Sequence, residues 1–319
     1  MAFYDIIQDV GIIAKRYIKD FVRRYNKEVG VPYYSHLDFK GLHQESFTFT
    51  NSKGIEIHYF YYYYDNYKDD IVILFCSGIG PGHTAYLAEI NQLAKRGYKV
   101  LTLDYTGCGE SKGECLASLN MPTLDVMDLL DYLKLDKPIV LVGHSLGGYT
   151  SLNVLNLRKD ICISIVLSGF LSIDSLIFNV VKNRFITSRI LKYERKAVIE
   201  YYGIDNVKYL ETTTDRILFV HSKDDPMVSY KSSIEVINNL NNPSIKTITL
   251  NNRMHNPNYT DDAVKYLNNV FTKYNELINK KIIKTDEDKI RYFKNVSIEK
   301  LTEQDEKIFD EIASFIEMK

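Results

Sequence analysis

The sequence contains little cysteine, no long apolar run and no excess of charge of one sign. Its four cysteines form no Cys-x-x-Cys pair, so neither a zinc site nor a disulfide framework is expected, and the thiols should be reduced. The 40 basic residues nearly cancel the 41 acidic ones, which leaves a net charge of −1. This balance argues against nucleic acid and anionic membrane surfaces as partners, because both attract a summed basic field.

Charged residues interrupt residues 1–28 every few positions. The segment therefore lacks the apolar core of a signal peptide and the roughly 20 apolar residues of a membrane span, which favours a cytoplasmic location. Its apolar residues instead recur near helical spacing, as at Ile6, Val10 and Ile13. They predict an amphipathic helix within a helical extension, residues 1–45, that packs on its own domain. Interfacial contact of residues 1–28 with a membrane is the alternative.

The chain of 319 residues, 45% of them hydrophobic, is long enough for one large domain with an insertion or for two domains. Residues 46–50 and 55–63 flank a polar turn that ends in Gly54, and they predict an antiparallel hairpin. Short apolar runs that alternate with helical stretches then follow at residues 71–76, 99–103, 139–142, 163–167, 217–220 and 245–250. This alternation predicts an α/β fold with a mostly parallel sheet, buried on both faces.

Residues 171–214 separate the fourth of these runs from the fifth, and their apolar residues follow helical spacing. We expect a helical cap inserted into a core made of residues 46–170 and 215–319. Residues 280–300 are rich in charge and weakly periodic, so a surface excursion is expected there. A last amphipathic helix should follow, because Ile308, Ile312 and Phe315 recur at helical spacing.

One of the strands leads directly into a short glycine-rich turn. Residues 139–142 precede Gly143-His144-Ser145-Leu146-Gly147, and helical spacing resumes immediately afterwards. Such a strand-to-helix turn presents a nucleophile above a sheet, and glycines two positions on either side leave room for it. The pattern predicts that Ser145 is a nucleophile. A serine hydroxyl needs a general base, which is normally a histidine oriented by a carboxylate.

The base and the carboxylate are sought in loops at the carboxyl ends of the strands. His255 follows the last predicted strand, in a loop that can reach across this edge, and it is the favoured base among seven histidines. Two adjacent acids follow the preceding strand: Asp225 is favoured because the Asp-Pro pair fixes the turn, and Asp224 remains an alternative. Asp174 is a third candidate. The chain order is serine, aspartate, histidine.

Three motifs together resemble the α/β-hydrolase family, in its serine esterase, monoglyceride-lipase-like and aminopeptidase-like branch. Beside the serine turn they are residues 103–111, which resemble the family's D-x-x-G-x-G-x-S loop, and residues 222–228, which resemble its acid loop. The resemblance covers residues 46–275 and implies the α/β-hydrolase fold. Two departures are Ser77-Gly78, where the family usually has His-Gly, and Ser222, where it often has Gly. By position, the backbone N–H groups of Ile79 and Leu146 should form the oxyanion hole.

The predicted activity is hydrolysis of a small carboxylic ester with an apolar acyl group, through an acyl-enzyme and without a metal or cofactor. Peptidase, thioesterase and amidase activities use the same three groups and stay open. Dehalogenase and epoxide hydrolase chemistry is disfavoured, because those relatives carry aspartate at the nucleophile position. A non-catalytic binding protein of the same fold is the alternative from another class. Nothing in the sequence indicates the oligomeric state.

Overall fold

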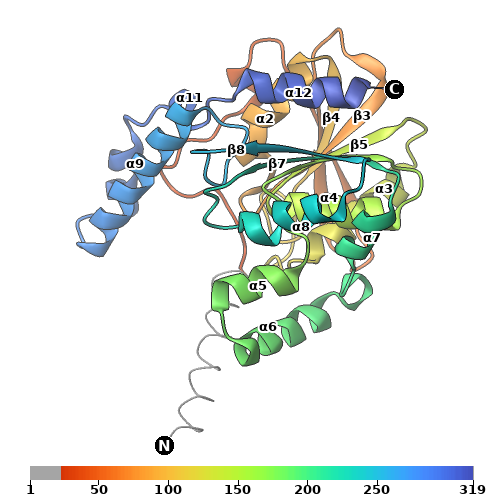
Figure 1. The fold of residues 1–319 in the computed structure, drawn as a ribbon. Helices are drawn as coiled ribbons and strands as arrows, with labels where there is room; N and C mark the ends of the chain where they lie inside the picture. The colour runs from red at the N-terminus through yellow and green to blue at the C-terminus, as the bar shows by residue number, and fades with distance from the viewer. Residues whose placement is uncertain (1–22, 319) are drawn as a thin grey trace, which may run out of the picture.

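The computed structural model describes residues 23–318, and Figure 1 shows their arrangement. Eight strands form one sheet in the order β1-β2-β4-β3-β5-β6-β7-β8. The strands are β1 (His43–Thr50), β2 (Glu56–Tyr63), β3 (Lys68–Cys76), β4 (Tyr98–Leu103), β5 (Ile139–His144), β6 (Ile163–Leu167), β7 (Arg216–Ser222) and β8 (Ile245–Leu250). β1 pairs antiparallel with β2 and β2 with β4, while all other neighbours are parallel. The predicted hairpin and mostly parallel sheet are confirmed.

Helices cover both faces of the sheet. In Figure 1, α2 and α12 lie on one face, and α3, α4, α7 and α8 lie on the other. These helices are α2 (Leu87–Lys95), α3 (Met121–Leu133), α4 (Leu146–Leu157), α7 (Asn206–Thr212), α8 (Ile234–Leu240) and α12 (Glu306–Glu317). Two buried apolar clusters correspond to the two faces, and both draw on the β-branched residues of the central strands. Burial on both sides explains why these strands are continuous apolar runs.

The chain between β6 and β7 forms α5 (Ile173–Val181), α6 (Arg184–Ala197), the 3-10 helix η3 (Ile199–Tyr201) and α7. The helical spacing of residues 171–214 thus predicted helices correctly. The side chain of Ser172 accepts a hydrogen bond from the N–H of Ser175 at the start of α5, and that of Asn183 does the same for Phe185 at the start of α6. In Figure 1, α5 and α6 form a further layer outside the helices of that face.

The C-terminal part contains two helices that the sequence did not indicate. After α9 (Asp261–Asn279), the charge-rich residues 280–300, most of them exposed or partly exposed, form α10 (Asp286–Phe293) and the start of α11 (Ile298–Leu301). Phe293 and Leu301 are buried in a small apolar cluster with Val270 of α9. Both helices are short, so each supplies too few apolar positions for a clear period.

The shorter 3-10 helices are η1 (His36–Asp38), η2 (Gly82–Tyr86) and η4 (Tyr230–Ser232). The amphipathic helix predicted from Ile6 onward lies outside the described residues. Within residues 23–318, no helix combines the length and the apolar character that crossing a bilayer requires.

Candidate active site

Ser145 occupies a strained turn between β5 and α4. Its backbone has φ 55° and ψ −115°, in a region that residues with a side chain rarely adopt. The N–H of Ser145 donates to the carbonyl oxygen of Leu167 at 2.9 Å, which ties the turn to the end of β6. The turn therefore holds Ser145 at the carboxyl edge of the sheet, where α/β proteins place their ligand sites.

The glycines on either side of Ser145 are required by close backbone contacts. A Cβ atom on Gly143 would lie 2.1 Å from the carbonyl oxygen of Gly147, and one on Gly147 would lie 1.9 Å from that of Cys76. Real Cβ atoms do not come so close to backbone atoms. The tight crossing of β3, β5 and α4 thus explains the Gly-x-Ser-x-Gly spacing.

Side chains from three loops meet at Ser145. The Oγ atom of Ser145 lies 2.9 Å from Nε2 of His255, and Nδ1 of His255 lies 2.8 Å from Oδ2 of Asp225. His255 comes from the loop after β8, and Asp225 from the loop after β7. The geometry forms a continuous hydrogen-bonded series from hydroxyl to imidazole to carboxylate, which is the arrangement that activates a serine.

Backbone N–H groups of its own loop hold the side chain of Asp225. Its side chain is buried, and its Oδ1 atom accepts hydrogen bonds from the N–H groups of Met227 at 2.8 Å and Val228 at 2.9 Å. Burial alone would raise the pKa of Asp225, but hydrogen bonds from His221 and His255 outweigh it and hold this pKa well below its ordinary value. Asp225 is therefore a carboxylate that faces His255.

The other acidic candidates lie elsewhere. Asp224 is exposed and accepts a hydrogen bond from the hydroxyl of Ser222. Asp174 is exposed in the first turn of α5. Of the three acids considered from the sequence, Asp225 is the one hydrogen-bonded to His255.

His144 contacts the site in a way that the sequence did not reveal. Its Nε2 atom donates to the backbone carbonyl oxygen of His255 at 2.8 Å, and its Nδ1 atom lies 3.0 Å from the hydroxyl of Tyr86. Since a carbonyl only accepts, Nε2 carries the proton and Nδ1 accepts from Tyr86. Burial and the nearby His255 lower the pKa of His144 to about 3, so the ring is neutral. The only available signal was that His144 adjoins Ser145.

The loop after β3 lies beside Ser145. A Cβ on Gly78 would lie 2.4 Å from the hydroxyl oxygen of Tyr86 and 3.3 Å from Cβ of Ser145. Ile79 and Leu146, the two residues expected to donate from their backbones, line the same cavity as Ser145. Their role as oxyanion donors stays a prediction.

Asp104, from the D-x-x-G-x-G-x-S motif, anchors the loop after β3 through hydrogen bonds. Its side chain is fully buried and accepts hydrogen bonds from the backbone N–H of His83 at 2.7 Å and from that of Glu110 at 2.8 Å. The ring nitrogen Nδ1 of His83 also lies 2.9 Å from this carboxylate. The motif therefore joins the loop after β4 to the loop after β3, and it positions the latter next to Ser145.

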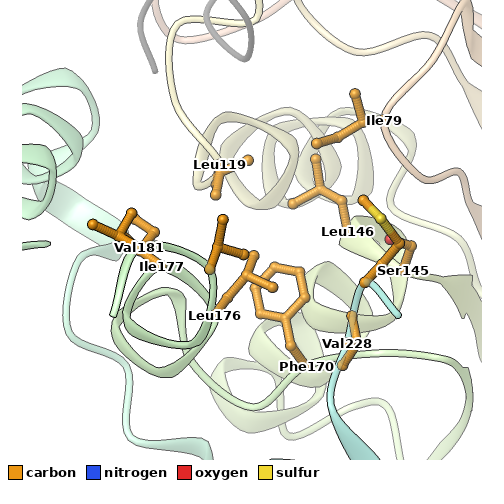
Figure 2. Close-up of a pocket in the computed structure, with 11 residues that line it drawn as sticks. Ile79, Leu119, Ser145, Leu146, Phe170, Leu176, Ile177, Val181 and Val228 are labelled. Carbon is orange, nitrogen blue, oxygen red and sulfur yellow. The ribbon is translucent and has the colours of Figure 1, made fainter. Parts of the chain in front are cut away.

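An apolar cavity extends from Ser145 towards α5. Its described lining consists of Ser145 and ten apolar side chains, among them Leu119, Leu146, Phe170, Ile177 and Val181. In the view of Figure 2, Ser145 lies at one end of this set, and Ile177 and Val181 of α5 lie at the other. Such a lining suits a hydrocarbon group attached to a carbonyl carbon at Ser145.

Residues 23–318 contain no group of three or more histidine, cysteine or acidic side chains that could hold a metal ion. The four cysteines are free thiols, and Cys76 and Cys108 are buried. Burial raises the pKa of Cys76 to about 12, which keeps this thiol protonated.

Comparison with known sequences points to hydrolases. Residues 68–196 match the family described as serine aminopeptidase, S33. Over 164 residues the chain is 29% identical to the lysophosphatidylserine lipase ABHD12 of Xenopus tropicalis, a match that covers 47% of this chain and 41% of that protein. A stretch of 91 residues is 35% identical to an epoxide hydrolase of Caballeronia sordidicola, covering 28% of this chain and 27% of that enzyme. The match spans less than half the length of either relative.

Comparison with solved structures concerns the fold alone, because the identities are low. An esterase of Pyrococcus furiosus superimposes with a TM-score of 0.57 and 17% identity, over 80% of this chain and 98% of that one. The mouse alpha/beta hydrolase domain-containing protein 10 gives a TM-score of 0.50 and 20% identity, over 74% of this chain and 99% of that one.

Proposed function

The chain belongs to the α/β-hydrolase family, and from this premise we propose that it is a serine hydrolase that cleaves carboxylic esters with an apolar acyl group. One observation carries the proposal: Ser145, His255 and Asp225 form a hydrogen-bonded series with contacts of 2.9 Å and 2.8 Å. The same chain matches lipases and esterases in sequence and fold. Serine at the nucleophile position separates it from hydrolases that attack epoxides with an aspartate.

In the proposed reaction, Oγ of Ser145 attacks the ester carbonyl carbon while Nε2 of His255 takes the hydroxyl proton. The negative charge that develops on the carbonyl oxygen is stabilised by the N–H groups of Ile79 and Leu146. Asp225 keeps the imidazole oriented and stabilises its charged form.

The tetrahedral intermediate then collapses. The C–O bond to the alcohol breaks, the alcohol takes the proton from His255, and the acyl group stays on Ser145. A water molecule gives its proton to His255 and attacks the acyl-enzyme, which releases the carboxylic acid and restores the serine. The cycle consumes one water and requires no redox partner.

We also propose that residues 171–214 act as a cap that selects the acyl group. Leu176, Ile177, Val180 and Val181 of α5 line the cavity that begins at Ser145. Apolar side chains gain free energy by removing a hydrocarbon chain from water, whereas the charged terminus of a peptide would lose its hydration there. This lining favours an apolar ester over an aminopeptidase substrate.

The test is hydrolysis of p-nitrophenyl esters from acetate to decanoate, together with labelling by a fluorophosphonate probe. We expect activity towards the esters and covalent labelling, both abolished in Ser145→Ala. A matched Ser151→Ala variant, which changes a buried serine within α4, should keep both. A folded protein that is inert to every ester and to the probe would overturn the proposal in favour of a binding role. Faster cleavage of the matching amides would instead establish an amidase or peptidase.

A further inference from the structure

One side of α6 is strongly basic. The helix buries Ile186, Ile190 and Glu194 against the rest of the protein. The exposed positions on the opposite side are Arg184, Phe185, Ser188, Arg189, Lys192, Arg195 and Lys196. We call these seven residues the basic face of α6. Five of the seven are cations, although the chain as a whole has a net charge of −1.

No acidic side chain among residues 23–318 pairs with these cations. From residue 175 to residue 199 the sequence contains one acid, Glu194. Glu194 is fully buried and accepts hydrogen bonds from the hydroxyl of Ser118 and the N–H of Leu119. Within residues 23–318, none of the five cations forms an ion pair. Arg195 lies over the ring of Tyr202, 5.8 Å from its centroid, which leaves its charge unneutralised. Their positive field is therefore directed to the solvent and to whatever binds there.

Exposed apolar side chains adjoin this face. Phe178 and Val180 at the end of α5 are 41% and 65% exposed, and Phe185 in the first turn of α6 is 79% exposed. Large apolar side chains gathered at one turn between two helices are costly in water. Together with the cations they form an amphipathic surface at the α5–α6 turn.

The cavity of the active site opens beside this surface. Val180 and Met227 both line the cavity, yet they are 65% and 58% exposed, so they lie at its mouth. A second groove, between α5 and α6, is lined by Arg184, Lys192 and Arg195 together with the hydroxyl-bearing Thr187 and Ser188. The buried hydroxyl of Thr187 has no hydrogen-bond partner among the described residues.

We propose that the α5–α6 surface docks on an anionic lipid bilayer. The cations of α6 meet acidic headgroups, and Phe178 and Phe185 enter the boundary between headgroups and acyl chains. This orientation places the mouth of the cavity at the membrane, so that an acyl chain passes from the bilayer towards Ser145. The last step rests on the proposed function, whereas docking does not.

An anionic bilayer can bind both the cations and the exposed apolar side chains of this surface, whereas other polyanions can bind only the cations. Nucleic acid would attract the cations through its phosphates, but it offers nothing to aliphatic side chains such as Val180. The balanced overall charge argues against a partner attracted by a summed basic field, but the cations are concentrated on one helix. A local cluster of cations is sufficient for binding to an anionic membrane, because the electrostatic attraction is screened by salt within about 10 Å.

Vesicle sedimentation tests the docking. The full chain is mixed with vesicles of phosphatidylcholine alone, or of phosphatidylcholine and phosphatidylserine in equal parts. We expect binding to the anionic vesicles that weakens as salt is added. A triple variant, Arg184→Gln, Arg189→Gln and Lys192→Gln, should weaken it on the order of a hundredfold, because each cation near an anionic surface contributes roughly fivefold. Phe185→Ser should weaken binding without changing its dependence on salt.

The matched control removes two exposed lysines of α9 and the exposed lysine that directly follows it, with Lys265→Gln, Lys273→Gln and Lys280→Gln, and should bind like the wild type. Absence of binding to anionic vesicles would overturn the proposal, as would an equal loss in both triple variants or binding only to an oligonucleotide. Ser145→Ala should bind vesicles normally. The α6 triple variant should hydrolyse a soluble short ester at the wild-type rate, so a failure of docking and a failure of catalysis are distinguishable.

Discussion

The ring of His144 supports the backbone of His255, because its Nε2–H donates to the carbonyl oxygen of His255 at 2.8 Å. The other ring nitrogen is occupied by the hydroxyl of Tyr86. Tyr86 in turn lies against Gly78, which directly precedes Ile79 in the loop after β3. The buried His144 and the half-buried Tyr86 thus connect the loop beside Ser145 to the loop that carries the proposed base.

We therefore expect His144 to act as a positioning residue. In His144→Ala the loop of His255 loses its fixed donor, and kcat should fall by about tenfold to a hundredfold while KM changes little. His144→Gln keeps an N–H donor and should recover most of kcat. Tyr86→Phe should lower kcat less. The measurements are steady-state kinetics on a soluble ester and thermal unfolding of each variant. A positioning role for His144 would be contradicted if the loss of kcat followed the loss of Tm and the Gln variant recovered no kcat.

Asp225 and Asp224 provide a matched pair for testing the carboxylate. In Asp225→Asn an amide N–H would face Nδ1 of His255, which favours the tautomer with its proton on Nε2, and that nitrogen then cannot accept from Ser145. We expect kcat to fall on the order of 10³-fold or more. Asp224→Asn, at an exposed side chain, should stay within about twofold. Equal losses in the two variants would remove the basis for assigning Asp225.

The strands, the hairpin and the serine turn could be predicted because their signals are local. Continuous β-branched runs such as residues 139–142 mark buried parallel strands, and Gly143-x-Ser145-x-Gly147 is a short motif that can be read directly, although the contact that requires Gly147 is with Cys76 of β3. The choice between Asp224 and Asp225 could be made only from the three-dimensional structure. Both follow β7, and only the path of the loop decides which carboxylate turns towards His255.

Contacts between distant segments could not be predicted. Tyr86 and His144 are separated by 58 residues, and neither position has a periodic pattern that links it to the other. The same holds for the anchoring of the loop after β3 by Asp104, although the motif itself was recognised. Helices α10 and α11 were missed because a charged sequence with few apolar residues gives a weak period, even where Phe293 is buried.

The cavity predicts a dependence on acyl-chain length. Ile177→Trp adds bulk at the end of the cavity that lies away from Ser145 in Figure 2, so a long acyl chain should lose its place while a short one keeps it. We expect kcat/KM for the decanoate ester to fall about tenfold or more and that for the acetate ester to stay within about twofold. Ile199→Trp, at a side chain that is 65% exposed, is the control. A uniform loss along the ester series would argue against an acyl role for this cavity.

Glu89 of α2 predicts a dependence of stability on pH. This carboxyl is buried beside Asn258, whose side-chain N–H donates to it at 3.3 Å. Burial raises the pKa of Glu89 to about 7 in the folded protein, while the unfolded chain has the ordinary value near 4.5. Between these two pH values the folded state keeps a proton that the unfolded state loses. The contribution of Glu89 to the free energy of unfolding is therefore full below about pH 4.5 and declines as the pH rises to about 7.

Glu89→Gln mimics the protonated carboxyl and should remove this decline. The carbonyl oxygen of the new amide can accept from the side-chain N–H of Asn258, as the carboxyl oxygen of Glu89 does at 3.3 Å in the wild type. Relative to the wild type, the variant should gain stability between pH 5 and pH 8, on the order of 3 kcal/mol, as measured by urea unfolding. Glu287→Gln, an exposed acid of α10, should follow the wild-type curve throughout. If Glu89→Gln and the wild type differed by a constant amount at every pH, the pKa of Glu89 would be the same in the folded and the unfolded protein. Hydrogen bonds with Asn258 and Tyr259 would then fully compensate its burial.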